Sequence, residues 1–204
     1  MHRKIQYWQG PKYHHGLRGG KILLVGESHY SNENLDVAQV FNFTADVVKS
    51  KALQNEIAFF RHIRLTALGG QLADHEIKPE DFWNSVAFCN VVQDIAPEPS
   101  RGISGRDALI VGWKALGETI EELRPDVMLV YSLAAWDHEV PNWWGNVTES
   151  RIFGNSDALI RFTNGEHTVL AAGMNHPRSL GARRDVWVAL AELVWQEFAA
   201  GNAC

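Results

Sequence analysis

The chain has 204 residues, of which 46% are apolar and 21% charged, and its net charge at pH 7 is −5. This composition is typical of a globular protein rather than a disordered one, and the length predicts a single domain over residues 1–204. The acidic balance argues against a protein that coats nucleic acid indiscriminately, because such binding neutralises many phosphates. It is compatible with a local basic face.

Cysteine usage and hydropathy bear on the compartment. The two cysteines, Cys89 and Cys204, show no spacing of a disulfide framework or a zinc site, which favours a reducing environment inside the cell. No apolar run approaches the roughly 18 residues of a membrane span, and no hydrophobic stretch of a signal peptide is visible. His14, His15 and His29 lack a third metal ligand at regular spacing. We therefore expect a cytoplasmic protein with no membrane contact, no metal and no cofactor.

Short apolar runs predict the strands of the core. Each is rich in Val, Leu, Ile or Ala and is closed by a Gly, an Asn or a polar residue, as expected of a buried strand. The four runs are residues 21–25, 86–90, 127–131 and 168–172. The dipeptide Asn164-Gly165, just before the last run, predicts a hairpin turn. Residues 132–157 form a long polar and aromatic segment.

Apolar residues at helical spacing predict the helices. One helix is expected over residues 53–68, where it stops at Gly69. A second begins at Ser104, in an arrangement like a capping box, and ends before Pro125. The last is expected over residues 183–199.

The alternation of strands and helices predicts parallel βαβ units, in which ligands bind at the carboxyl ends of the strands. Three segments with polar or special residues follow predicted strands. They are Gly26–Tyr30, Asn90–Asp94 and Gly173–Pro177. Because these ends meet at one edge of a parallel sheet, the three segments predict one site.

These segments resemble the active-site motifs of the uracil-DNA glycosylase superfamily. Gly26-Glu-Ser-His-Tyr30 resembles its first motif, and the apolar run that ends at Asn90 resembles the strand that carries its base-reading Asn. His176-Pro-Arg-Ser-Leu180 resembles its C-terminal His-Pro-Ser motif, and the match extends from Lys21 to about Asp185. The resemblance implies a three-layer α/β/α sandwich whose central sheet has four parallel strands in the order 2-1-3-4. It also implies a hydrolase that excises uracil or a related damaged base from DNA by cleaving the N-glycosidic bond.

The resemblance implies roles for several side chains. Asn90, with a donor and an acceptor, would pair with the O4/N3 edge of uracil. His176 would donate a hydrogen bond to the base O2, where negative charge develops. Tyr30 would exclude a 5-methyl group, and either Phe41 or Phe43 would stack on the base.

The first motif departs from the family pattern in one important position. Many members have Asp at its third position, where this chain has Ser28. Glu27 is therefore the candidate catalytic carboxylate, while Gly26 and Ser28 are expected beside the substrate. Asp94 stands where the iron–sulfur branch has a cluster Cys, and two cysteines cannot supply a four-Cys cluster.

Two runs without acidic residues follow site motifs and predict a DNA-binding face around the same opening. The arginines in these runs are Arg101, Arg106, Arg178, Arg183 and Arg184. Leu180, by resemblance, would fill the gap that a flipped nucleotide leaves in the duplex. Salt-sensitive binding is expected, since each phosphate contact adds to the salt dependence.

Three functions compete at this stage. The first is a monomeric glycosylase acting on DNA, single-stranded DNA included. The second is a protein that uses the same site to bind a nucleobase, a nucleotide or nucleic acid without cutting, or with another activity. The third is an unrelated doubly wound α/β enzyme for a nucleotide-like small molecule, since fold does not fix function.

Overall fold

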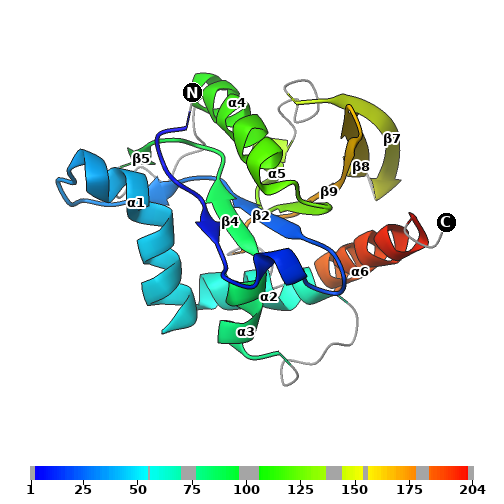
Figure 1. Ribbon diagram of the computed structural model, residues 1–204, viewed down its shortest axis with the longest axis horizontal. Coiled ribbons are helices and arrows are strands. Elements are labelled where there is room, and N and C mark those ends of the chain that lie inside the picture. Colours follow the sequence, from blue (N-terminus) through cyan, green and yellow to red (C-terminus); the bar gives the residue numbers. More distant parts are fainter. Residues whose placement is uncertain are drawn as a thin grey trace.

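A computed structural model describes residues 3–54, 56–69, 77–96, 106–136, 144–153, 156–177 and 184–201. Within these residues a mixed sheet of seven strands runs through the molecule in the order β1-β4-β2-β6-β9-β8-β7 (Figure 1). The strands in that order are β1 (Trp8–Gln9), β4 (Ala87–Asn90), β2 (Ile22–Gly26), β6 (Val127–Val130), β9 (His167–Gly173), β8 (Ser156–Asn164) and β7 (Asn146–Phe153). A second, two-stranded sheet pairs β3 (His29–Tyr30) with β5 (Ile95–Ala96).

The α/β class is confirmed, but the sheet is larger than four parallel strands. All four predicted runs form strands, and these lie side by side as β4-β2-β6-β9 with parallel pairing at each step. Antiparallel strands extend the sheet at both ends: β1 beside β4, and β8 then β7 beside β9. These additions pair backbone groups that the outer parallel strands would otherwise expose.

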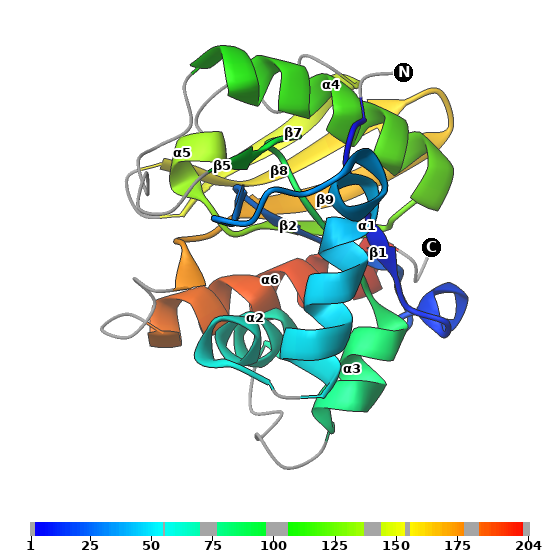
Figure 2. The same cartoon turned by 90° about the vertical axis from the view of Figure 1, so that its left-hand side faces the viewer.

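Helices cover both faces of the sheet (Figure 2). One side carries α1 (Val37–Val48), the π-helical turn η2 (Lys49–Leu53), α2 (Ala58–Leu68), α3 (Pro79–Ser85) and α6 (Arg184–Gly201). The other side carries α4 (Arg106–Leu123) and α5 (Leu133–Trp136). We call these sides the α2 face and the α4 face. A short 3-10 turn, η1 (Tyr13–His15), precedes β2.

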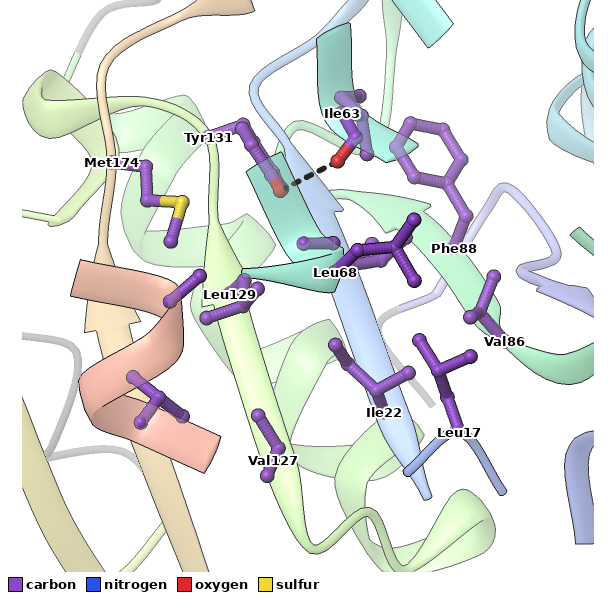
Figure 3. Close-up of a cluster of buried hydrophobic side chains, with 14 of the residues drawn as sticks. Leu17, Ile22, Ile63, Leu68, Val86, Phe88, Val127, Leu129, Tyr131 and Met174 are labelled. Atoms are coloured by element: carbon purple, nitrogen blue, oxygen red, sulfur yellow. Dashed lines mark hydrogen bonds between the residues drawn. The ribbon is translucent and has the colours of Figure 1, made fainter. Parts of the chain in front are cut away.

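Strand alternation assigns each core residue to one face. Ile22 and Leu24 of β2 join the core under α2, whereas Leu23 and Val25 join the core under α4. Figure 3 shows the α2-face core, in which the buried Tyr131 hydroxyl donates a hydrogen bond to the carbonyl of Ile63, at 3.1 Å. This bond ties α2 to the carboxyl end of β6.

Two sequence predictions need correction. Residues 53–68 are not one helix: Leu53 ends η2, and α2 begins only at Ala58. The break is fixed by an ion pair in which the Arg64 guanidinium holds both carboxylate oxygens of Glu56, at 2.8 and 2.9 Å. The polar segment 132–157 contains regular structure, because α5, all of β7 and the start of β8 lie within it.

Other predicted elements are close to those observed. The second helix is described from Arg106 and ends at Leu123, beyond which Arg124 has a φ of 47°; Ser104 lies outside the described residues. The hairpin turn joins β8 to β9, with Gly165 at a φ of 59° that favours glycine. In the described part of the chain, no helix has the length and apolar character needed to cross a membrane.

Candidate functional site

The carboxyl ends of the four parallel strands meet at one edge of the sheet, and backbone hydrogen bonds continue the pairing beyond them. The amide N–H of Val91 donates to the Gly26 carbonyl at 3.0 Å, and that of Val92 donates to the Glu27 carbonyl at 2.8 Å. On the other side, Met174 N–H donates to the Val130 carbonyl at 2.7 Å. The first motif, the Asn90 segment and the His176 segment are therefore built into one edge.

Asn90 is the most informative side chain at this edge. It is only 5% exposed, and its side-chain oxygen lies directly against the face of Gly26 on the neighbouring strand. A Cβ at position 26 would collide with this oxygen and would also lie 3.4 Å from the ring of Phe88. Gly26 is therefore required for the Asn90 carboxamide to occupy its place. Within the described residues, that carboxamide has no hydrogen-bond partner.

Ser28 presents a second polar group without a partner. Its hydroxyl oxygen is buried and makes no hydrogen bond with any described residue. Tyr30, two residues on, is half-buried and belongs to β3, which pairs with β5 after the Asn90 segment. The first motif thus continues beside the chain that follows Asn90.

His176 lies on the α2 face of the same edge. Its half-buried ring packs against Phe59 in the first turn of α2, with ring centroids 5.5 Å apart. The next residue, Pro177, uses its carbonyl to accept a hydrogen bond from the His62 ring at 3.0 Å. Asn90 shares this face by strand alternation, because Phe88 belongs to the core under α2. The predicted base-reading Asn and the predicted catalytic His therefore lie on one side of the sheet.

Glu27 is held from the opposite face. The Ser132 hydroxyl donates a 2.7 Å hydrogen bond to its carboxylate and accepts one from the Ala135 N–H, so that Ser132 also caps α5. Trp136 of α5 packs over Gly173 so closely that a Cβ at position 173 would collide with its ring. On the α4 face, this edge is therefore filled by bonded and packed side chains.

The two candidate stacking residues differ in their surroundings. Phe43 is half-buried and packs edge-on against His29, with centroids 5.0 Å apart, whereas Phe41 is 43% exposed. The buried His29 ring is hydrogen-bonded to the Thr44 hydroxyl at 2.8 Å, and burial lowers the pKa of His29 to about 4. His29 is therefore neutral at pH 7 and anchors the first motif to α1.

The predicted DNA-binding face cannot be placed. Arg101, Arg178, Leu180 and Arg183 lie outside the described residues. The other two arginines of that prediction, Arg106 and Arg184, begin α4 and α6, and their side chains are not among those described. In the described part of the chain, no group of three His, Cys, Asp or Glu side chains is arranged to hold a metal ion.

Sequence reasoning missed three residues that support the site. Ser132 holds Glu27, Thr44 holds His29, and Gln93 bonds the backbone of Asn90. A Ser directly after a predicted strand and before a short helix is a capping signal that would have indicated Ser132. Thr44 reaches His29 from another element, and Gln93 is held by the distant Lys4 and Ile5, so the sequence carries no local signal for either.

No known protein family matches the sequence, and no curated protein is significantly similar to it.

Proposed function

We propose that this edge binds a nucleobase and that the chain is a uracil-DNA glycosylase-like hydrolase. The Asn90 side chain carries the proposal, because the residue is only 5% exposed and its carboxamide makes no hydrogen bond with a described residue. Each hydrogen bond that a ligand makes with this amide contributes about 0.5–1.5 kcal/mol net, so a ligand that matches both its donor and its acceptor is favoured. The carbonyl and N–H of a lactam edge, such as O4 and N3 of uracil, match the donor and acceptor of the amide.

The position of His176 supports cleavage of a bound nucleotide. When the N-glycosidic bond breaks, the bonding electrons leave with the base as an anion and the sugar becomes oxocarbenium-like. Water then adds to the sugar carbon and loses a proton, and the base takes one up. A donor fixed against the base O2 lowers such a barrier by roughly 3–4 kcal/mol. His176 and Asn90 share the α2 face, as one base held by both requires.

Glu27 is the candidate carboxylate for the sugar side of the reaction. Its charge would favour the cationic sugar, which the neutral Ser28 hydroxyl cannot do. The hydrogen bond from Ser132 fixes one of its oxygens at the edge. In this scheme Glu27 acts from the α4 face and His176 from the α2 face, with the scissile bond between them.

The same contact favours a second candidate, a protein that binds a nucleobase without cutting it. A carboxylate oxygen that already accepts a hydrogen bond from Ser132 is less available to accept one from a water molecule. With Ser28 in place of the usual Asp, the first motif would then retain base binding and lack water activation.

Uracil-containing single- and double-stranded oligonucleotides distinguish the two candidates. The purified protein is incubated with each, treated with alkali and analysed on a gel, while binding of free uracil is measured by calorimetry. For the hydrolase, His176→Ala should slow cleavage by a factor on the order of 100–1000. Glu27→Gln should remove a substantial part of the cleavage activity, and Ser28→Ala should remove little of it. His15→Ala, on an exposed turn, is the matched control. Full activity of His176→Ala would refute the mechanism, and uracil binding without cleavage would establish the second candidate.

The DNA partner has a separate test. Arg183→Ala together with Arg184→Ala should weaken oligonucleotide binding and lower its dependence on salt concentration. Binding that is indifferent to salt would contradict a DNA face formed by these arginines.

A further inference from the structure

The N-terminal arm, which we define as residues 3–9, is bound to the segment that carries Asn90. The backbone N–H groups of Lys4 and Ile5 both donate to the side-chain oxygen of Gln93, each at 3.1 Å. Gln93 is 7% exposed and lies three residues beyond Asn90. A buried amide therefore joins the start of the chain to the carboxyl edge of the sheet.

The other end of the same amide holds Asn90. The Gln93 side-chain nitrogen donates to the Asn90 carbonyl at 3.0 Å. Because backbone N–H groups can only donate, the two arm contacts require the Gln93 oxygen to face the arm and its nitrogen to face Asn90. Gln93 thus connects the arm to the backbone of the residue whose side chain is predicted to contact the base.

The arm itself is fixed at two further places. Gln6 N–H donates to the Phe41 carbonyl of α1 at 2.7 Å. On α4, Glu122 accepts hydrogen bonds from Arg3 at 2.9 Å and from the Tyr7 hydroxyl at 3.1 Å. Because α1 and α4 hold the arm from both faces of the sheet, the arm fixes the position of Gln93.

We infer that Gln93 is a positioning residue for base recognition: it fixes the Asn90 backbone so that the carboxamide keeps its direction over Gly26. This inference rests on the proposed function, because it concerns the ligand of the same site. Gln93 touches no base in this scheme and acts only through Asn90. A side chain that must meet a ligand with two hydrogen bonds needs such support, since small misplacements weaken both.

Two variants separate the arm contact from the Asn90 contact. Gln93→Met keeps the approximate side-chain volume and removes the hydrogen bonds to the arm and to Asn90. Gln93→Glu keeps an acceptor for the Lys4 and Ile5 N–H groups but removes the donor to the Asn90 carbonyl. Both should lower the affinity for free uracil about ten-fold. Gln9→Met, on the same arm, removes a side-chain hydrogen bond to the exposed His14; it is the control and should bind uracil like the wild type. Wild-type affinity of Gln93→Glu would overturn the inference.

A double-mutant cycle shows whether Gln93 acts through Asn90. In the Asn90→Ala background, Gln93→Met should change uracil affinity less than two-fold, because the side chain that it positions is gone. A full ten-fold loss in that background would overturn the inference.

Hydrogen exchange gives a readout that needs no ligand. Gln93→Met should speed exchange of the Val91 and Val92 amides at least ten-fold and leave those of β6 unchanged, since these two amides pair the Asn90 segment with β2. Unchanged exchange would overturn the inference whether or not the wild type binds uracil. If the wild type binds no uracil and exchange does accelerate, the proposed function fails while the structural link through Gln93 stands.

Discussion

Two polar side chains on neighbouring strands, Asn90 and Glu27, differ in what the protein around them supplies. Asn90 is 5% exposed and has no side-chain partner within the described residues. Glu27 accepts a hydrogen bond from Ser132, which in turn caps α5. Asn90 is the side chain that we propose a ligand contacts, whereas Glu27 is hydrogen-bonded to the residue that joins β6 to α5.

The comparison extends to the faces on which the two groups lie. The Ser28 hydroxyl of the first motif is also buried without a partner in the described part of the chain. On the α4 face, Trp136 packs tightly over Gly173. Changes on the α2 side should therefore affect ligand binding more than stability, and changes on the α4 side should do the reverse.

The largest effect is expected from adding a methyl group at Gly26, where β2 contacts the Asn90 side chain of β4. Gly26→Ala places a methyl group against the Asn90 side-chain oxygen, and such overpacking typically costs 1–3 kcal/mol of unfolding free energy. It should also abolish uracil binding, because the carboxamide must move. Urea denaturation and calorimetry measure the two effects. Gly201→Ala, where the nearest atom to a new Cβ is 3.9 Å away, is the control and should change neither quantity. Uracil binding by Gly26→Ala would contradict the role assigned to this contact.

Acid should destabilise the protein through His29, the anchored part of the first motif. Its pKa is about 4 when folded, because of burial, and about 6.5 when unfolded, so the unfolded chain binds more protons between these values. The unfolding free energy should fall as the pH drops from 6.5 to 4, by at most about 1.4 kcal/mol per pH unit. His29→Gln should flatten this slope in urea titrations at several pH values. An equally steep slope in the variant would assign the acid sensitivity to other groups.

On the α4 face, loss of the Ser132 hydroxyl should lower stability and leave uracil affinity unchanged. Ser132→Ala removes the cap of α5 and the bond to Glu27, at a cost of about 1 kcal/mol in unfolding free energy. Uracil affinity should stay within two-fold of the wild type. Ser50→Ala, at an exposed position in η2 just after α1, serves as the control for thermal denaturation. A large loss of uracil affinity in Ser132→Ala would mean that the two faces are not independent.

Replacing Asn90 should have the smallest effect on stability, together with a large loss of uracil affinity. Asn90→Ala removes an amide that has no partner in the described residues, so no hydrogen bond is lost and the unfolding free energy should change by less than about 1 kcal/mol. Uracil affinity should fall by more than the roughly ten-fold loss expected of Gln93→Met, while residual binding stays measurable by calorimetry. Thr44→Val provides the contrast, because it leaves the buried His29 nitrogen unpaired and should destabilise more. A stability loss at Asn90 larger than at Thr44 would show that Asn90 has a structural role.

The parts of the fold that local patterns determine were predictable. The runs around Val25, Cys89, Leu129 and Ala171 are apolar on both faces because helices cover both, and each appears as a central strand. The turn at Gly165 was equally clear, since only glycine adopts its φ easily. These features depend on residues close together in the chain.

The missed parts depend on pairing between distant segments. Strand β1 is two residues long and exists because Trp8 and Gln9 pair with β4. Strand β7 contains two register shifts, which break the alternation by which a strand is recognised. At the site, the segments were predictable from the strand ends, but the contact of Asn90 with Gly26 and the bond of Glu27 to Ser132 required the strand order.

The position of β1 has a consequence for the order in which the protein folds. The first strand of the chain pairs with Phe88 and Ala87, which are made much later, and it lies outside β4 rather than beside β2. Closing so long a loop carries an entropic cost that is repaid only once the β2–β4 pair exists. Strand β1 should therefore be among the last segments to join the sheet, although it precedes all the others of that sheet in the chain.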